Sequence, residues 1–116
     1  MGAATYHFKI EQGSTFRVDI TYKDESGDPI DLNGYSARMQ LRRRIDDDEP
    51  VLELTTGNGR LVLGGDTGSV EINVNASDTE GLDATEGVYD LELISGAGIV
   101  DKLLRGTFEI IREVTR

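Results

Sequence analysis

Two alternating stretches around a turn, within residues 16–41, constrain the fold of this chain more than any other feature. Apolar and polar residues alternate along 16–23 and again along 35–42. A period of two places successive side chains on opposite faces of an extended chain, so each stretch is predicted to be a strand with one buried face. Between them, Gly27 and Pro29 stand among acidic residues, which is typical of a tight reversal. The segment therefore predicts a strand–turn–strand hairpin.

The rest of the chain carries the same alternation in shorter pieces. Apolar residues recur at every second position in 6–10, 51–55, 61–63, 70–74 and 89–93, and more loosely in 99–114. Glycine-rich turns at 57–59 and 95–98 separate several of these stretches. We expect residues 51–74 to form a three-stranded meander. The long last strand, 99–114, is expected to bend or bulge near Gly106 and to offer edge or terminal contacts.

One short helix is predicted. Residues 77–80 read Ser-Asp-Thr-Glu, a capping-box pattern that places Ser77 at the cap and Glu80 three residues later. Gly81 limits the helix to about one turn. Leu82, which follows, is expected to close the open end of the sandwich.

The fold class follows from the number of strands and from one tyrosine. Gly87 precedes Tyr89 by two residues at the start of a predicted strand, a pattern similar to the tyrosine corner of immunoglobulin-like sandwiches. Leu91 stands where an antibody domain would carry a cysteine. The sequence predicts an all-β fold, an immunoglobulin-like antiparallel β-sandwich of about eight strands, with at most one short helical turn near Ser77–Leu82. A chain of 116 residues suits a single domain, 1–116.

Charge and cysteine content exclude several function classes. The chain has a net charge of −10, from 22 acidic and 12 basic residues. Such a surface repels phosphates, so nucleic acid is not an expected partner. The acidic surface has two interpretations: it keeps the protein soluble, or it docks onto a basic partner. The absence of cysteine excludes disulfides, thiolate metal sites and thiol nucleophiles, and it fits folding in a reducing cytoplasm.

Targeting signals are not visible in the sequence. Residues 1–10 lack a charged region followed by an apolar run, so no signal peptide is expected. No stretch approaches the roughly 18 apolar residues of a membrane span, so no membrane partner is expected. The chain is therefore expected to be soluble and not exported.

Few residues suited to catalysis are present. His7 is the only histidine, and it is expected on the solvent-facing side of a strand. With one histidine and no cysteine, neither a zinc site nor a Ser-His or Cys-His pair has its usual parts. Acidic residues fall mostly on outward strand faces and in turns, and no glycine-rich turn leads into a helix with the lysine of a phosphate-binding loop. We therefore expect no catalytic residues, no cofactor and no small-molecule substrate.

The run at 42–49 is the most strongly charged part of the surface. Three arginines are followed, after Ile45, by three aspartates and a glutamate, and Pro50 closes the run. Adjacent opposite charges favour an exposed loop that partly neutralises itself. The four acids could instead hold Ca²⁺, but they lack the alternating spacing and central glycine of a calcium loop. The residues predicted to contact a partner are Arg42, Arg43, Arg44, Asp46, Asp47, Asp48, Arg112 and Arg116.

The segment EQGSTFRVDITYKDESGDPIDLNGYSARMQLR, residues 11–42, resembles a recurrent pattern of tailed-bacteriophage structural proteins. Its sharpest element is the turn GDPIDLNGY at 27–35, and the later stretch EGVYDLELIS resembles the continuation seen in small phage proteins. The family it is most similar to is the N-terminal immunoglobulin-like module of phage baseplate upper proteins. The resemblance implies a non-enzymatic virion structural protein, a connector or adaptor of the tail tip, baseplate or fibre attachment. It also implies other virion proteins as partners in a symmetric assembly, and a location in the virion after assembly in the host cytoplasm.

Two other functions stay open. A capsid decoration (cement) protein is the first, because small sandwiches suit that role too. A carbohydrate-binding module, or a remnant hydrolase that uses surface carboxylates, is the second. Exposed aromatic residues would favour carbohydrate binding, but the chain has no tryptophan. Its tyrosines, which are expected to face the core, are Tyr6, Tyr22, Tyr35 and Tyr89.

Overall fold

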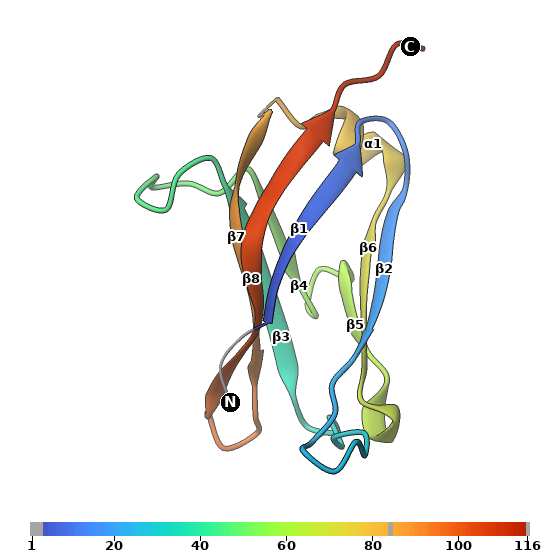
Figure 1. Ribbon diagram of the computed structural model, residues 1–116, viewed down its shortest axis with the longest axis vertical. Helices are drawn as coiled ribbons and strands as arrows, with labels where there is room; N and C mark the ends of the chain where they lie inside the picture. Colours follow the sequence, from blue (N-terminus) through green and yellow to red (C-terminus); the bar gives the residue numbers. More distant parts are fainter. Residues whose placement is uncertain (1–3, 84, 116) are drawn as a thin grey trace.

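The described residues form an all-β sandwich of eight strands in two facing sheets (Figure 1). The computed structural model describes residues 4–83 and 85–115. The larger sheet has the strand order β1 (Ala4–Glu11), β8 (Val100–Ile111), β7 (Glu86–Ile94), β3 (Ser36–Arg42) and β4 (Leu52–Thr55). The smaller sheet has the order β2 (Phe16–Thr21), β6 (Ser69–Val74) and β5 (Leu61–Leu63). A 3-10 turn, η1 (Gly65–Thr67), and one short helix, α1 (Ala76–Glu80), lie between strands. The predicted fold class is confirmed.

The strand order is that of an immunoglobulin-like sandwich. The smaller sheet, β2-β6-β5, matches strands B, E and D, and β8-β7-β3-β4 of the larger sheet matches G, F, C and C′. All pairs are antiparallel except one: β1 runs parallel to β8 along its whole length. The first and last strands of the chain therefore lie side by side.

The core lies between the inner faces of the two sheets. Along most of the strand residues buried and exposed positions alternate, as the sequence pattern predicts, with an interruption at the register shift between β7 and β8. Leu82 is buried beyond α1 and closes one end of the sandwich, which confirms that prediction. The most deeply buried large side chains include Leu32, Met39, Leu41, Leu54, Leu61, Ile72, Leu91, Leu93 and Phe108.

The hairpin predicted for residues 16–41 is wrong in one respect: β2 and β3 do not pair. The reversal itself is present, because the Asp24 carboxylate accepts hydrogen bonds from the Ser26 and Asp28 amides. The chain then crosses to the opposite sheet, and Leu32 is buried on the way. A strand with one buried face shows the same alternation whether its sequence neighbour lies in the same sheet or in the facing sheet. The alternation therefore could not predict that β2 and β3 belong to different sheets.

The meander predicted for residues 51–74 is wrong for the same reason. β5 and β6 pair as expected, but β4 pairs with β3 in the larger sheet. The turn at 57–59 therefore carries the chain between sheets. Asn58 shapes this turn, since its side-chain oxygen accepts hydrogen bonds from the Thr55 and Arg60 amides.

The last strand is also placed differently from the prediction. β8 lies between β1 and β7, so it is an interior strand and not an edge. Its irregularity falls where the register with β7 shifts between Leu91 and Glu92, which leaves Leu103 as the extra residue. Gly106, where the bulge was predicted, keeps regular partners on both sides.

The helix starts two residues earlier than the capping box suggests. Asn75 is the N-cap, and its side-chain oxygen accepts the Asp78 amide at 2.9 Å. Ser77, the predicted cap, lies inside the helix and donates its hydroxyl to Asn75. Asn and Ser are equally suitable N-caps, so the sequence offers two possible helix starts, and the helix begins after Asn75, the earlier of the two. Gly81 follows the helix, as predicted.

Tyr89 occupies the position of a tyrosine corner, but its hydroxyl is bonded elsewhere. In a tyrosine corner the hydroxyl returns to backbone a few residues upstream. Here it donates to the backbone oxygen of Tyr6, on β1. Leu91 is fully buried on the same face of β7.

Candidate functional site

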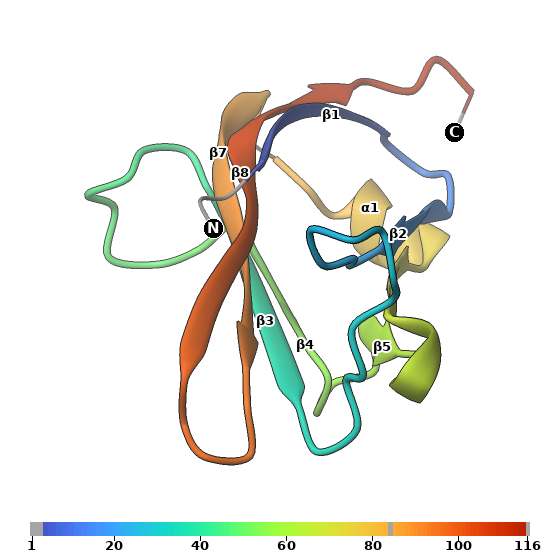
Figure 2. The same ribbon diagram turned by 60° about the horizontal axis from the view of Figure 1, so that its bottom comes forward.

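The charged run predicted as a contact loop, residues 42–49, begins at the end of β3. It continues into a loop, residues 43–51, that projects from the sandwich between β3 and β4 (Figures 1 and 2). Arg42, at the end of β3, stabilises the loop with hydrogen bonds from its side chain. Its guanidinium donates to the Asp47 backbone oxygen at 2.5 Å and to the Gln40 side chain at 2.6 Å. The Asp47 amide in turn donates to the Arg44 oxygen at 3.1 Å. These bonds hold the loop in a defined shape.

The side chains at the tip of the loop face solvent. Arg44, Asp46 and Asp48 are exposed there, whereas Arg43, at the base of the loop, pairs with Asp83 at 2.9 Å. Ile45, between them, has 87% of its surface exposed. This isoleucine was not among the predicted contact residues. A lone apolar residue inside a charged run was the signal that could have found it.

Arg112, a predicted contact residue of the C-terminal tail, lies at the same end of the molecule as the loop. Arg112 is exposed just after β8 and lines a shallow depression with Asp83, the residue that also pairs with Arg43. The structure therefore brings residue 112 and the base of the loop around one aspartate. Arg116 lies outside the described residues.

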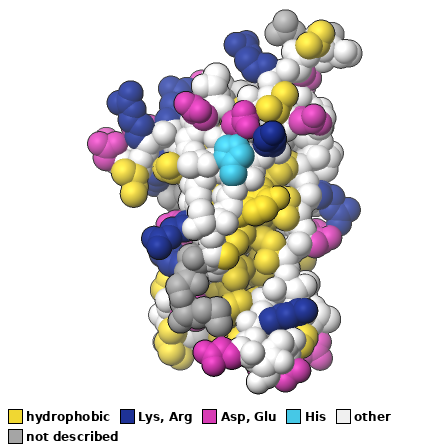
Figure 3. All heavy atoms as spheres, in the orientation of Figure 1, with side chains coloured by type: hydrophobic (Ala, Val, Ile, Leu, Met, Phe, Trp, Pro, Cys, Tyr) yellow, Lys and Arg dark blue, Asp and Glu magenta, His cyan; other side chains and the backbone are white. Residues whose placement is uncertain are grey.

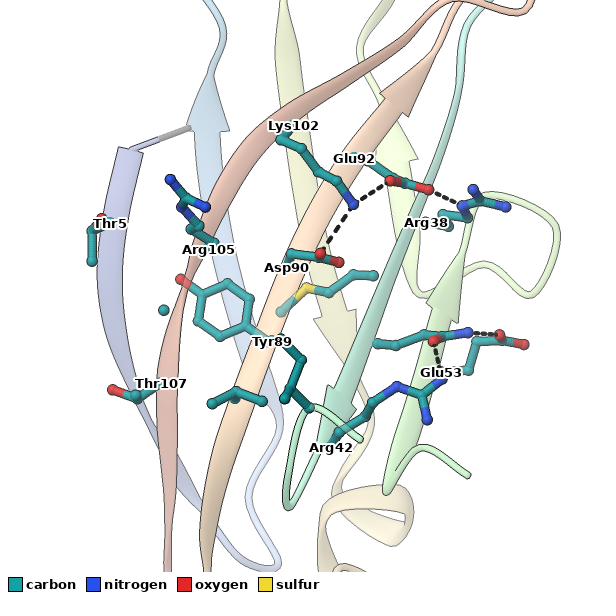
Figure 4. A pocket seen from close by; sticks show the side chains of 15 residues that line it. Thr5, Arg38, Arg42, Glu53, Tyr89, Asp90, Glu92, Lys102, Arg105 and Thr107 are labelled. Carbon is teal, nitrogen blue, oxygen red and sulfur yellow. Dashed lines mark hydrogen bonds and ion pairs between the residues drawn. The ribbon is translucent and has the colours of Figure 1, made fainter. Parts of the chain in front are cut away.

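A broad groove lies on the outer face of the larger sheet (Figure 4). Its floor is formed by outward side chains of β3, β7 and β8, and Ile45 of the loop also lines it. The groove was not predicted, because it depends on which strands are neighbours. Its charged lining residues are Arg38, Arg42, Glu53, Asp90, Glu92, Lys102 and Arg105.

An acidic side chain is buried under two cations on the groove floor. Glu92 is only 6% exposed, and it pairs with Lys102 at 2.6 Å and with Arg38. Burial raises the pKa of Glu92, but hydrogen bonds and charges from Lys102 and Arg38 outweigh it, so the pKa lies below its ordinary value. The hydrogen bond to Glu92 raises the pKa of Lys102. The side chains of Arg38 and Lys102 are 59% and 50% exposed. The two cations of this cluster are therefore accessible to solvent, whereas the Glu92 carboxylate is not.

Tyr89 lines the groove but is not poised for proton transfer. Burial raises the pKa of Tyr89 to about 12, and its hydroxyl is already bonded to a backbone oxygen, so it is a poor proton donor or acceptor near neutral pH. His7 lies on the outer face of β1, as predicted, with Nδ1 at 2.6 Å from the Thr107 hydroxyl. Within residues 4–83 and 85–115, no cluster of histidine and acidic side chains is placed to hold a metal ion. In the groove, the basic side chains of Arg38 and Lys102 are paired with the acidic ones of Glu92 and Asp90.

The tyrosines only partly meet the expectation that they face the core. Tyr89 is buried, and Tyr22 and Tyr35 are half-buried, but Tyr6 is 56% exposed. Tyr6 points inward from β1, yet β1 and β2 are edge strands, so the flank between the sheets is open there. Figure 3 shows apolar side chains along this flank, beside the cyan His7. The Tyr6 ring lies against Phe8 instead, at 4.9 Å between centroids.

No protein-family model matches the sequence, and no curated protein matches it significantly. In the part of the chain that is described, neither helical segment has the length and apolarity needed to cross a membrane. We therefore infer function from the surface chemistry together with the sequence resemblance.

Proposed function

We propose that this protein is a non-enzymatic connector that acts through protein–protein contacts, and that its setting is the tail tip, baseplate or fibre attachment of a tailed bacteriophage. The phage setting is supported by the resemblance of residues 11–42 to phage structural proteins. The contact function is supported by the surface of the molecule.

The exposure of Ile45 is the observation that carries the contact function. Ile45 is 87% exposed and stands between Arg44 and Asp46 in the chain, an apolar residue with polar neighbours that matches an interface anchor with a polar rim. Bonds from Arg42, and the Arg43–Asp83 pair, already order the loop. A loop that is ordered before binding loses little conformational entropy when a partner covers it.

The groove supports a binding role over a chemical one. Its acids and bases are mostly paired with each other, as in the Arg38–Glu92–Lys102 cluster. A catalytic acid or base needs a free position within hydrogen-bond reach of substrate. In a symmetric particle the same weak surface contact is repeated on every copy, and the combined contacts would hold the protein firmly.

The phage setting is tested by locating the chain in purified particles with electron microscopy and a labelled antibody. We expect label at the tail tip, baseplate or fibre attachment. Label on capsid lattice points would replace the tail assignment with a decoration role. Absence from particles would overturn the virion setting altogether.

The contact function is tested in the same particles with Ile45→Asp. We expect this variant to fold but to be lost from particles. The matched control is Val62→Asp, on β5, because Val62 is also apolar and 47% exposed but lies on the other sheet. Equal incorporation of the two variants would contradict a contact role for the loop.

A further inference from the structure

We infer that the free edge of β2 binds one extended segment of a partner protein, which adds a fourth strand to the smaller sheet. The segment presents apolar side chains toward the core and a basic side chain beside Asp19. The inference goes beyond the proposed function, because it concerns a different surface from the Ile45 loop and does not depend on the phage setting. Three features of this flank support it: the backbone of β2, the exposed inner face of β1, and the charge of Asp19.

The outer edge of β2 carries backbone groups without partners. The Tyr22 amide, just after β2, donates to the Gly68 oxygen, just before β6, at 2.8 Å. In an antiparallel ladder, successive residues direct their N–H and C=O alternately toward and away from the neighbouring strand. Counting back from Tyr22, every second residue of β2 bonds to β6 and the others point outward. The outward residues, whose backbone groups have no hydrogen-bond partner among the described residues, are Arg17, Asp19 and Thr21. An extended chain is the ligand that matches such a row of donors and acceptors.

The inner face of β1 is incompletely covered. The larger sheet has five strands and the smaller has three, and on the open flank the two sheets end in β1 and β2 (Figure 1). Tyr6 lies on the inner face of β1 yet is 56% exposed, and Val18 and Ile20 of β2 are only half-buried. A strand added beside β2 would extend the smaller sheet beneath β1, and its inward side chains would cover these residues. Those side chains must therefore be apolar.

Asp19 determines the charge on the outer face of the segment. It is exposed, and its direct neighbour in the ladder with β6 is Glu71, a second acid. Glu71 is bonded to Arg17 at 2.6 Å, whereas Asp19 has no basic partner among the described residues. Like charges directly opposite each other on two strands are destabilising, so a basic residue on the free side of Asp19 would offset the repulsion. The net charge of −10 also attracts a basic segment.

A single segment suits this edge better than the edge strand of a second copy. Pairing β2 of two copies would bring two sandwiches together, each with a larger sheet that ends at the same flank. A second copy would also carry its own net charge of −10, which opposes the approach. A lone strand has no second sheet to accommodate, and its outer face can be basic throughout.

The inference is tested by amide hydrogen exchange, followed by NMR, with a synthetic peptide. The probe is Lys-Val-Thr-Val-Lys-Val-Thr-Val-Lys, blocked at both ends, in which valine alternates with polar residues. Without peptide, we expect fast exchange at the outward amides of β2 (Arg17, Asp19 and Thr21) and slow exchange at those of Val18 and Ile20. Peptide at millimolar concentration should slow the outward amides by about tenfold or more. Unchanged exchange at these amides would overturn the inference.

Two controls separate strand pairing from other causes of slow exchange. A peptide of the same composition without the alternation, Val-Val-Lys-Thr-Lys-Thr-Lys-Val-Val, should leave the exchange unchanged. Equal slowing by both peptides would show that charge alone attracts them, and would overturn the strand pairing. If the outward amides are already slow without peptide and become fast on dilution of the protein, a second copy occupies the edge, and the assignment to a partner segment is overturned.

A charge swap tests the position of the basic residue. Asp19→Lys should weaken binding of the lysine peptide by about tenfold, because an attraction becomes a repulsion. A peptide with glutamate in place of the central lysine should bind this variant more tightly than it binds the wild type. Asp66→Lys changes the net charge equally but lies in η1, beyond β6, so it should change the affinity less than about twofold. Equal effects of the two substitutions would overturn the pairing at Asp19.

Discussion

The Tyr89 hydroxyl donates a 2.8 Å hydrogen bond to the backbone oxygen of Tyr6, across the full width of β8. Gly106 is the residue of β8 that faces both tyrosines in the two ladders. A Cβ added at Gly106 would lie 2.1 Å from the Tyr6 oxygen, the acceptor of this bond. Because Gly106 has no side chain, the Tyr89 side chain of β7 can reach across β8 and form a hydrogen bond to the edge strand β1.

Replacing Gly106 with Ala should strongly destabilise the protein. The added methyl group would overlap a backbone oxygen that cannot move without displacing β1. We expect a loss of about 3 kcal/mol in the free energy of unfolding, measured by urea denaturation. Gly57→Ala is the control, because its added Cβ would lie 3.6 Å from the nearest atom, the Thr55 hydroxyl oxygen, and the change should stay within about 0.5 kcal/mol. Equal losses for the two variants would contradict the steric role of Gly106.

Tyr89→Phe should lower stability and flatten its alkaline dependence. Loss of the hydrogen bond to Tyr6 should cost about 1 kcal/mol at neutral pH. Because the pKa of Tyr89 is raised from 10.0 to about 12 in the folded protein, its contribution is complete below pH 10 and is lost as pH rises toward 12. The difference in unfolding free energy between wild type and variant should therefore shrink over that interval in denaturation curves. A constant difference would show that the hydroxyl does not titrate with unfolding.

Glu92→Gln should remove an acid-dependent part of the stability. The pKa of Glu92 is lower in the folded protein than its ordinary value of 4.5, so its carboxylate contributes above that value and the contribution is lost as pH falls through the folded-state pKa. We expect a loss of about 1 kcal/mol at pH 7, because the partner cations are half exposed and water screens the pairs. Thermal melts of both proteins should converge in acid. Glu53→Gln, on the exposed edge strand β4, is the control and should change little at any pH.

Asn75→Ala should destabilise the protein more than Ser77→Ala. Asn75 caps the Asp78 amide, whereas Ser77 is exposed and bonds only to the Asn75 side chain. The expected losses in unfolding free energy are about 1 kcal/mol for the cap and less than about 0.5 kcal/mol for the serine. If chemical denaturation shows a larger loss for Ser77→Ala than for Asn75→Ala, Ser77 and not Asn75 is the N-cap.

The alternation of side chains predicted the strands well, because it reflects the burial of one face. It predicts Met39 and Leu41 as core residues and Arg38 and Gln40 as surface residues, and the structure places them so. It does not say which strands are neighbours. The pairing of β2 with β6, and of β4 with β3, depends on contacts between distant residues, to which local patterns are blind.

The candidate site was predicted only where it is local in sequence. The charged loop after β3 could be read directly from residues 42–49, although the importance of Ile45 was missed. The groove could not be predicted, because Arg38, Glu92 and Lys102 meet only through the order β3-β7-β8 and through the register shift after Leu91. The bond between Tyr89 and Tyr6 depends on the same order and on the parallel placement of β1.

The parallel pairing of β1 with β8 has a mechanical consequence. The chain enters β1 at Ala4 beside Leu104 and leaves β8 at Ile111 beside Glu11, at the opposite end of the ladder. Tension applied through the two ends of the chain would slide these strands along each other and strain every ladder bond at once, whereas pulling an antiparallel hairpin open breaks its bonds one after another. We expect single-molecule pulling between residues 4 and 111 to need a higher rupture force than pulling the β7–β8 hairpin apart from residues 86 and 109. A connector attached to its neighbours through its two ends would then transmit a pulling force without unfolding.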